Sequence, residues 1–336
     1  MNTLEWTATV VLAEVGLILL ILLLPVLQAI RGPRPPEPEA PPALPLSPGV
    51  PEGEVLKTLS VVGSPDAGDT FNATYFYINT PNAIYNGWRF DRLVEVRAKG
   101  VRFTNCWFEG VNGNPRHTAL VRSATGLGSF TATYCTMKPK FPNDGPDCMR
   151  GSNVTASFCD LTLGVDGMQI YGDGSTRDDP NAGNVSITDC WFHEFPWYDN
   201  DSHSDGTHND IIEITGGSHI RFERNRCSDV CSGGGIFISQ AKQPVSDVII
   251  RGNSFENSGG RNVEGTGKAG AGINVYDGQG SGPVTGLVIE GNSFLKGAQN
   301  YPIIISGRTI EHPTTVIRDN IWTDGTSPAP TVKRGS

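Results

Sequence analysis

The stretch Val248-Ile-Ile-Arg-Gly-Asn253-Ser-Phe255 decides the fold, because its pattern occurs eight times between residues 101 and 322. The pattern is apolar-x-apolar-x-x-[Cys or Asn]-x-apolar. The Cys or Asn residue falls at these positions: Cys106, Cys135, Cys159, Cys190, Asn225, Asn253, Asn292 and Asn320. Successive positions differ by as few as 24 residues (135 to 159) and as many as 39 (253 to 292). A constant strand sequence with loops of variable length is typical of a solenoid.

In nearly every copy the first and third residues are apolar, usually with a polar residue between them. This is the period-two pattern of a strand with one face in a core. A second apolar strand follows in most repeats, starting at His117, Asp147, Asp166, Asp210, Gly235, Gly272 and Ile303. With two or three strands per coil and few helical patterns, the sequence predicts an all-β protein, a parallel β-helix of about 8–10 coils over residues 55–325.

The Cys or Asn of each copy is expected at a bend between strands, where side chains of successive coils stack. An Asn there can hydrogen-bond its neighbours along the axis, as in other stacked-strand structures. A Cys there is interpreted as a small buried apolar side chain; a disulfide between adjacent coils is the alternative. The chain has seven Cys. An odd number argues against a complete disulfide framework, although Cys227 and Cys231 are close enough in sequence to pair.

The repeat resembles that of the right-handed parallel β-helix proteins, the superfamily that includes pectate lyases, polygalacturonases and many phage tail spikes. The resemblance covers roughly residues 55–325 and implies a single-stranded, right-handed β-helix. It is closest to uncharacterised bacterial and phage β-helix proteins of the pectate-lyase-like type. It implies little about function, because the same fold serves lyases, hydrolases, epimerases and proteins that only bind.

The chain begins with an apolar segment, residues 7–30, that is long enough to cross a bilayer as a helix. We interpret residues 1–31 as a hydrophobic membrane-anchor helix. A cleaved signal peptide is the alternative, but no Lys or Arg precedes the apolar segment and the cleavage site is poor. The first basic residues follow the segment, which by the positive-inside rule places the rest of the chain in the cytoplasm. This conflicts with a role on external polysaccharides, so the predicted location is membrane-anchored or secreted, or on a virion if a phage encodes the chain.

Two other segments differ in composition from the repeat. Residues 32–54 are rich in Pro and are predicted to form an extended linker. Residues 326–336 are predicted to be a disordered tail. A solenoid needs a covered end, and the first coil and its cap are expected to use Trp88, Phe90, Leu93, Val94 and Val96.

The formal net charge is −9 and the isoelectric point is about 5.2. Nucleic acid is therefore not a predicted partner, because phosphate binding needs clustered Lys and Arg. Acidic surfaces suit neutral glycans and divalent cations, so a polysaccharide is the predicted partner and Ca²⁺ is the candidate cofactor. The sequence has no phosphate-binding glycine loop, no Ser-His-Asp elbow and no zinc-type Cys spacing, and no metal ligands are assigned.

Three successive second strands carry an acid at the same position and a polar side chain three residues later. The three pairs are Asp147 and Arg150, Asp166 and Gln169, and Asp210 and Glu213. Because the Met or Ile residues of these strands point inward, both rows are expected on the outer face. Acids in neighbouring coils then lie about 5 Å apart at their backbones, which is unfavourable unless a proton or a cation intervenes. This favours a functional site; the alternative is that Asp166-Gly167 is only a turn into the strand.

The longest polar insertion, residues 195–210, leads into the same row. Its aromatic, histidine and acidic residues are Trp197, Tyr198, Asp199, Asp201, His203, Asp205, His208 and Asp210. Aromatic faces stack on sugar rings, and carboxylates and histidines act in acid–base chemistry. The alternative is that the histidines are solvated loop residues.

Residues 203–217 resemble a segment of the uncharacterised pectate-lyase-like proteins named above. The segment reads His-Ser-Asp-Gly-Thr-His-Asn-Asp-Ile-Ile-Glu-Ile-Thr-Gly-Gly. The resemblance implies that His203 and Asp205, which match its His-x-Asp-Gly element, lie at a glycan site. Those relatives often have Gln on the following strand where this chain has Glu213, so the match is partial.

Two mechanisms fit the acid row. In hydrolysis one carboxyl protonates the leaving oxygen and a second carboxylate activates water; the candidates for these roles are Asp166, Asp205, Asp210 and Glu213. In a calcium-dependent lyase the acids hold the cation while a base removes a proton, and that base is Arg150 or His208. The scarcity of basic residues near the row in sequence argues against an anionic substrate and favours hydrolysis.

The main prediction is therefore a protein that binds and cleaves a cell-surface or extracellular polysaccharide along its middle coils. Its candidate substrate-binding residues are Asp147, Arg150, Gln169, Trp197, Tyr198, His203 and Phe237. Tyr171, Phe237 and Tyr276 are either sugar platforms or ordinary surface. The alternatives are a non-catalytic glycan-binding adhesin, a phage tail-associated receptor-binding protein, and a purely structural spacer.

Overall fold

The computed structural model of the chain describes residues 48–58, 68–171, 183–198, 207–229, 234–256, 269–277, 282–297, 299–327 and 330–333. The chain divides into two units, residues 1–42 and 43–336, and every described residue belongs to the second. The predicted membrane segment, residues 7–30, and most of the predicted linker therefore lie outside the described residues. Within the described ranges, no helix is long and apolar enough to span a membrane.

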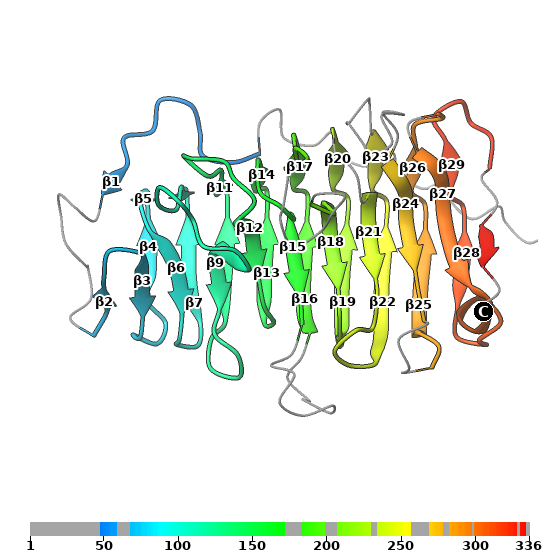
Figure 1. Cartoon of the computed structure of the whole chain (residues 1–336), viewed down its shortest axis with the longest axis horizontal. Helices are drawn as coiled ribbons and strands as arrows, with labels where there is room; N and C mark the ends of the chain where they lie inside the picture. The colour runs from blue at the N-terminus through cyan, green and yellow to red at the C-terminus, as the bar shows by residue number, and fades with distance from the viewer. Residues whose placement is uncertain are drawn as a thin grey trace, which may run out of the picture. The chain divides into compact units, whose positions relative to one another are not determined.

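The described strands form three sheets, which we call A, B and C, and their coils stack along one axis (Figure 1). In each coil the chain passes from sheet C to sheet A and then to sheet B. The sheets contain ten, eleven and nine strands for A, B and C respectively. Strands from successive coils pair in parallel, which confirms the predicted parallel β-helix.

Sheet C consists of β4 (Ile84–Asn86), β7 (Val101–Thr104), β10 (Phe130–Thr133), β13 (Val154–Ser157), β16 (Gly183–Thr188), β19 (Gly217–Glu223), β22 (Val245–Arg251), β25 (Thr285–Glu290) and β28 (Val316–Arg318). Sheet A consists of β1 (Lys57–Thr58), β5 (Trp88–Phe90), β8 (Trp107–Phe108), β11 (Thr136–Met137), β14 (Asp160–Thr162), β17 (Trp191–His193), β20 (Arg226–Ser228), β23 (Ser254–Glu256), β26 (Ser293–Phe294) and β29 (Ile321–Trp322).

Sheet B consists of β2 (Thr70–Phe71), β3 (Tyr75–Ile78), β6 (Leu93–Val96), β9 (Thr118–Ser123), β12 (Pro146–Arg150), β15 (Met168–Ile170), β18 (Asp210–Ile214), β21 (Gly234–Ile238), β24 (Ala269–Val275), β27 (Gln299–Ser306) and β30 (Thr331–Lys333). Only β2 and β3 pair antiparallel among the described strands. A single turn of helix, α3 (Gly307–Ile310), follows β27.

The eight copies of the repeat form every strand of sheet C after β4. The first residues of seven copies are in register: Val101, Phe130, Val154, Val185, Ile220, Val248 and Leu287. Burial alternates along these strands, and the first and third residues of each are the buried ones. The apolar positions of the repeat therefore form continuous rows in the core, as predicted.

The residue before each Cys or Asn turns the chain from sheet C into sheet A. It is left-handed in all eight copies, with φ between +51° and +64°, at Asn105, Tyr134, Phe158, Asp189, Arg224, Gly252, Gly291 and Asp319. A non-glycine residue pays about 1 kcal/mol or more for this conformation. Because only two of the eight are Gly, the residue types at this position do not reveal the bend.

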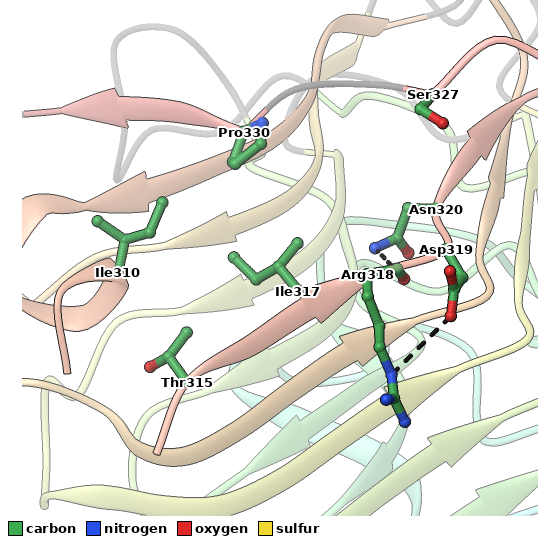
Figure 2. Close-up of a pocket in the computed structure, with 8 residues that line it drawn as sticks. All are labelled: Ile310, Thr315, Ile317, Arg318, Asp319, Asn320, Ser327 and Pro330. Atoms are coloured by element: carbon green, nitrogen blue, oxygen red, sulfur yellow. Dashed lines mark hydrogen bonds and ion pairs between the residues drawn. The ribbon is translucent and has the colours of Figure 1, made fainter. Parts of the chain in front are cut away.

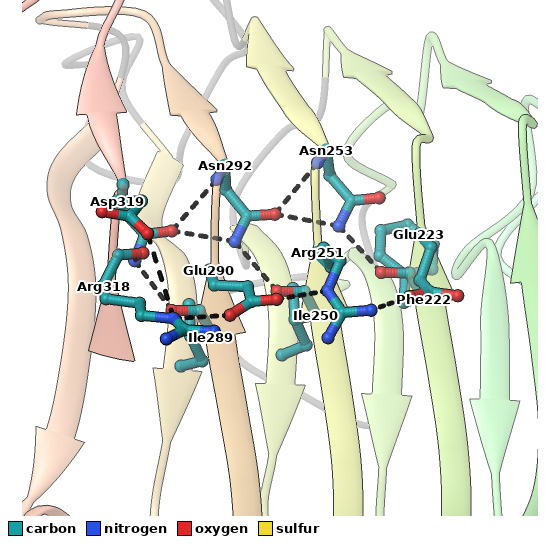
Figure 3. Close-up of polar contacts among 11 residues, drawn as sticks. Phe222, Glu223, Ile250, Arg251, Asn253, Ile289, Glu290, Asn292, Arg318 and Asp319 are labelled. Atoms are coloured by element: carbon teal, nitrogen blue, oxygen red, sulfur yellow. Dashed lines mark hydrogen bonds and ion pairs between the residues drawn. The ribbon is translucent and has the colours of Figure 1, made fainter. Parts of the chain in front are cut away.

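The four Asn residues form a hydrogen-bonded ladder along the axis, as predicted; Figure 3 shows its middle members, Asn253 and Asn292. Nδ2 of each of the first three Asn residues donates to Oδ1 of the Asn in the next coil, at 2.9 to 3.0 Å. The same Oδ1 accepts the backbone N–H of the preceding Asn at 2.8 to 3.1 Å. The ladder thus satisfies buried backbone groups at the bend, which would be costly to leave unpaired.

The four Cys residues of the earlier copies occupy the same position and are buried and free. Each thiol donates to the carbonyl oxygen two residues earlier, at 3.3 to 3.4 Å. Cys148 and Cys227 are also buried and free, and Cys231 lies outside the described residues. For the described Cys residues, the prediction of small buried side chains is confirmed, and the alternative of disulfides between coils is wrong.

The first coils have an aromatic core. All five residues expected there are buried: Trp88, Phe90, Leu93, Val94 and Val96. The buried Asp69, just before the antiparallel β2–β3 pair, accepts a hydrogen bond from the Tyr85 hydroxyl. This polar contact joins the cap to the aromatic core beneath it.

Both predicted ends of the β-helix need correction. Residues 48–58, which we call the strap, pass along the outside of sheet A (Figure 1). Gly49 N–H donates to Phe158 O at 2.9 Å and Val50 N–H to Thr136 Oγ1 at 3.0 Å. Ordered contacts therefore begin inside the predicted linker, 32–54. At the other end β30 pairs with β27, so paired structure extends into the predicted tail, 326–336.

Candidate functional site

The acids predicted to form one row lie side by side in sheet B, on β12, on β18 and just before β15. Cys148 N–H donates to Asp166 O at 2.8 Å, and Gly167 N–H donates to Asp210 O at 3.0 Å. These bonds set Asp147, Asp166 and Asp210 in line. The second predicted row is also in register, with the members Arg150, Gln169 and Glu213. Both alignments inferred from the sequence are confirmed.

Each acid shares the outer face with the polar residue three positions later because two consecutive residues between them point inward. Cys148 and Met149 both belong to the core, and so do Ile211 and Ile212. Simple alternation would have put Asp147 on the same side as Met149. Just before the middle strand, a Cβ on Gly167 would lie 2.5 Å from the Phe192 ring. Core packing thus favours glycine there, and Asp166 and Gly167 also lie at the bend that leads into β15, as the alternative interpretation expected.

The three aspartates are buried rather than open to solvent, with 2%, 6% and 7% of Asp147, Asp166 and Asp210 exposed. Burial is the largest influence on all three carboxyls and raises each pKa. For Asp147 the opposing Arg150 limits the rise to about 6. For Asp166 and Asp210 the pKa lies well above its ordinary value, because neighbouring carboxylates, including Glu213, add to the effect of burial. A row of buried carboxyls with raised pKa values is the kind of environment found at catalytic acids.

Hydrogen bonds connect the row to its surroundings. Arg150 Nε donates to Asp147, and Arg150 Nη1 donates to the backbone oxygen of His117. Asp166 Oδ1 accepts the backbone N–H of Asp210 at 2.8 Å. In the outer row, Gln169 Nε2 donates to Glu213. The partly exposed Gln169 and Glu213 thus lie as a polar pair beside the buried acids.

The described part of the 195–210 insertion packs beside the loop that leads into β15. The Tyr198 hydroxyl donates to Leu163 O at 3.1 Å, and Trp197 and Tyr198 are partly exposed. His208 is exposed. The other predicted residues of the insertion, His203 and Asp205, lie outside the described residues.

Asn209 is a residue that the sequence analysis missed. It is fully buried, and its Nδ2 donates to Val165 O at 2.6 Å and to Pro196 O at 3.1 Å. Its Oδ1 accepts from the Thr207 hydroxyl at 2.8 Å. These bonds hold the end of the insertion against the strand entry just before Asp210. The only sequence signal was an Asn next to an acid, which does not distinguish a buried anchor from a solvated turn.

The outer row continues in both directions beyond the three middle coils. Toward the N-terminus Arg150 is in register with Arg122, and Arg122 with Glu95. Toward the C-terminus Glu213 is in register with Phe237, and Phe237 is partly exposed. Tyr276, the residue after β24, is 43% exposed.

The structure therefore corrects one expectation about charge. Few basic residues lie near the acids in sequence, but Arg122 comes from the adjacent coil and Arg150 from the row itself. The inference that basic residues are scarce near the row therefore left out Arg122. Sequence distance hid Arg122 because strand pairing joins residues about one coil apart.

In the part of the chain that the structure describes, no group of three or more His, Cys, Asp or Glu side chains is arranged to hold a metal ion. A pocket of about 440 Å³ lies at the C-terminal end of the coils and is bordered by residues of α3, β28 and the following segment (Figure 2). It contains none of the predicted site residues.

Comparisons with known proteins give one similar solved structure to report. No protein-family model matches the chain, and no curated protein matches its sequence. The crystal structure of the Dettilon tailspike protein matches at 12% sequence identity, over 77% of this chain and 61% of that chain, with a TM-score of 0.28. The match thus spans less than two thirds of that protein. The parallel sheets and the eightfold repeat place the chain in the class of parallel β-helix proteins, and its candidate site is a row of buried acids on sheet B.

Proposed function

We propose that this protein binds an extracellular or cell-surface polysaccharide along the outer face of sheet B and hydrolyses it at the acid row. The observation that carries the proposal is the set of three buried, aligned carboxyls with raised pKa values. Burying three acids side by side is costly for a purely structural surface. Uncharged side chains would avoid that cost, which speaks against the structural-spacer alternative.

The chemistry needs one protonated carboxyl and one carboxylate. Asp166 and Asp210 fit the acid, because burial first and neighbouring charge second raise the pKa of each. Glu213 fits the carboxylate that activates water, since it is partly exposed and its charge acts on both aspartates. Phe237, one coil away, offers an aromatic surface for a neighbouring sugar.

Binding without cleavage is the second candidate function, and a specific observation favours it. With no more than 7% of any of the three aspartates exposed, a substrate must reach them past the outer row. A glycan-binding adhesin or a tail-associated receptor-binding protein would need only the outer face. In that case the buried acids would serve to position Arg150, Gln169 and Glu213.

The test is the release of reducing ends from bacterial surface polysaccharides by the full chain and by Asp210→Asn. Loss of a general acid lowers the rate by about 100-fold or more, while binding is retained. The matched control is Asp319→Asn, because the Asp319 side chain is 80% exposed and Asn tolerates its left-handed backbone. Glycan binding with no release of ends would establish the binding-only function. Products with a new carbon–carbon double bond would indicate a lyase instead.

A further inference from the structure

A second cluster lies on the outer face of sheet B, toward the N-terminus from the acid row. We call it the Arg–Tyr cluster; its residues are Tyr75, Tyr77, Glu95, Arg97 and Arg122. The two tyrosine rings stack with centroids 5.6 Å apart and planes 15° from parallel. The Arg97 guanidinium carbon lies 3.8 Å from the Tyr77 ring centroid, and that of Arg122 lies 5.3 Å from the Tyr75 centroid. The two rings therefore hold two guanidinium groups in place through cation–π contacts.

The cluster has an excess of positive charge. Glu95 is buried and accepts bonds from Arg97 Nε, at 2.6 Å, and from Arg122. Burial acts to raise the Glu95 pKa, but the two arginines outweigh it and hold the pKa below its ordinary value. One carboxylate thus faces two guanidinium groups, so the cluster has a net charge of +1. The whole chain, in contrast, has a formal net charge of −9.

Part of each guanidinium is available to a ligand. Glu95 is bonded by only one nitrogen of Arg97 and by Nε and Nη2 of Arg122. The two side chains are 40% and 29% exposed. Among the described residues no other acceptor engages their remaining N–H groups. Planar N–H pairs of this kind suit carboxylate and phosphate oxygens.

The cluster adjoins the acid row. Arg122 is in register with Arg150, which is bonded to Asp147. Successive strands lie about 4.8 Å apart, so Arg122 lies one coil from Arg150 and about two from Gln169. A glycan lying along sheet B over the acids would place a nearby sugar over the cluster.

We propose that the Arg–Tyr cluster is a subsite for an anionic substituent, a carboxylate or a phosphate, on a sugar close to the acid row. The proposal rests on the proposed polysaccharide binding and names its substrate class. The guanidinium groups of Arg97 and Arg122 bind the anion, and the tyrosines keep them oriented. Glu95 holds the two arginines together in the absence of ligand.

The test uses an array of bacterial surface polysaccharides with matched neutral, carboxylated and phosphorylated members, probed with the full chain at low and high salt. We expect anionic members to bind at least tenfold more tightly than neutral ones, with the difference shrinking at high salt. Arg97→Gln and Arg122→Gln are each expected to remove about tenfold of that preference. Arg318→Gln is the matched control, because Arg318 is also an exposed arginine paired with a carboxylate, on sheet C (Figure 3).

Glu95→Gln separates a ligand subsite from a structural ion pair. Gln keeps the shape but removes the internal anion, so anion binding should strengthen several-fold while neutral glycans are unaffected. Weaker or unchanged anion binding in Glu95→Gln would overturn the proposal. If neutral and anionic members bind equally well, and the arginine variants bind both as the wild type does, the anionic subsite is overturned. The proposed polysaccharide binding would still stand. Failure to bind any member would overturn both, and the carboxylated and phosphorylated arms identify which anion is used.

Discussion

The Asn ladder gives a prediction whose size can be worked out from the structure. Asn253 is 1% exposed, and its side chain makes four hydrogen bonds. Its Oδ1 accepts from the backbone N–H and the Nδ2 of Asn225 at 2.8 and 3.0 Å. Its Nδ2 donates to Phe222 O and to Asn292 Oδ1, each at 2.9 Å (Figure 3). Asn253→Ala removes all four.

The backbone N–H of Asn225 is left buried without its acceptor, which costs about 1–3 kcal/mol. Each of the other lost hydrogen bonds contributes about 0.5–1.5 kcal/mol. We therefore expect Asn253→Ala to reduce the free energy of unfolding by about 3–4 kcal/mol. Because coils of a solenoid contact only their neighbours, the loss should concentrate in the coils that contain these residues.

The assay is thermal unfolding combined with hydrogen exchange. A loss of about 3–4 kcal/mol lowers the midpoint by about 10 °C in a chain of this size, and β19, β22 and β25 should lose protection first. The control is Lys296→Ala, which removes an exposed ion pair with Asp324 and should cost less than about 1 kcal/mol. A midpoint within about 2 °C of the wild type, or a loss of protection spread evenly over all coils, would refute the reasoning.

Three other predictions follow from the same structure. Cys190→Asn should raise the unfolding free energy by about 1 kcal/mol in denaturant titrations, because the Cys190 N–H already donates to Asn225 Oδ1 at 2.9 Å and an amide would extend the ladder; a destabilised variant would contradict this. The free energy of unfolding should fall as pH rises from 5 to 7. The pKa of Asp147 is raised to about 6 in the folded protein, so folding favours its protonated form, and this contribution to stability is lost as pH rises through 6. Asp147 alone contributes about 1 kcal/mol over this range, and unchanged or rising midpoints would count against it. Gly49→Ala should detach the strap and speed its limited proteolysis at least tenfold, since φ is +103° and a Cβ would lie 2.7 Å from Thr136 Oγ1; an unchanged cleavage rate would disprove the docking.

Much of the fold could be predicted because its information is local. Each copy of the repeat carries its own strand and its own stacking residue, so eight strands of sheet C and the Asn ladder follow from the pattern alone. The acid row was predictable for the same reason: aligning Asp147, Asp166 and Asp210 requires only the strand register. The left-handed bend was not, because Tyr134 and Phe158 adopt it against their own preference.

The environment of the site could not be predicted in the same way. Burial of the aspartates depends on what packs over them and on two consecutive inward residues, such as Cys148 and Met149, which break the period of two. The position of Arg122 beside Arg150 depends on loop lengths that vary from coil to coil. These features arise from packing between coils, and no single segment encodes them.

The sequence by itself therefore determined the parallel coil, its register and the alignment of the candidate acids, because a repeat states the same local rule many times. Only the tertiary structure decided that these acids are buried and have raised pKa values, and that arginines and tyrosines from earlier coils adjoin them. The physical reason is that strand direction and spacing are properties of short segments. Solvent exposure and charge environment depend on every neighbour that the stacking of coils brings near.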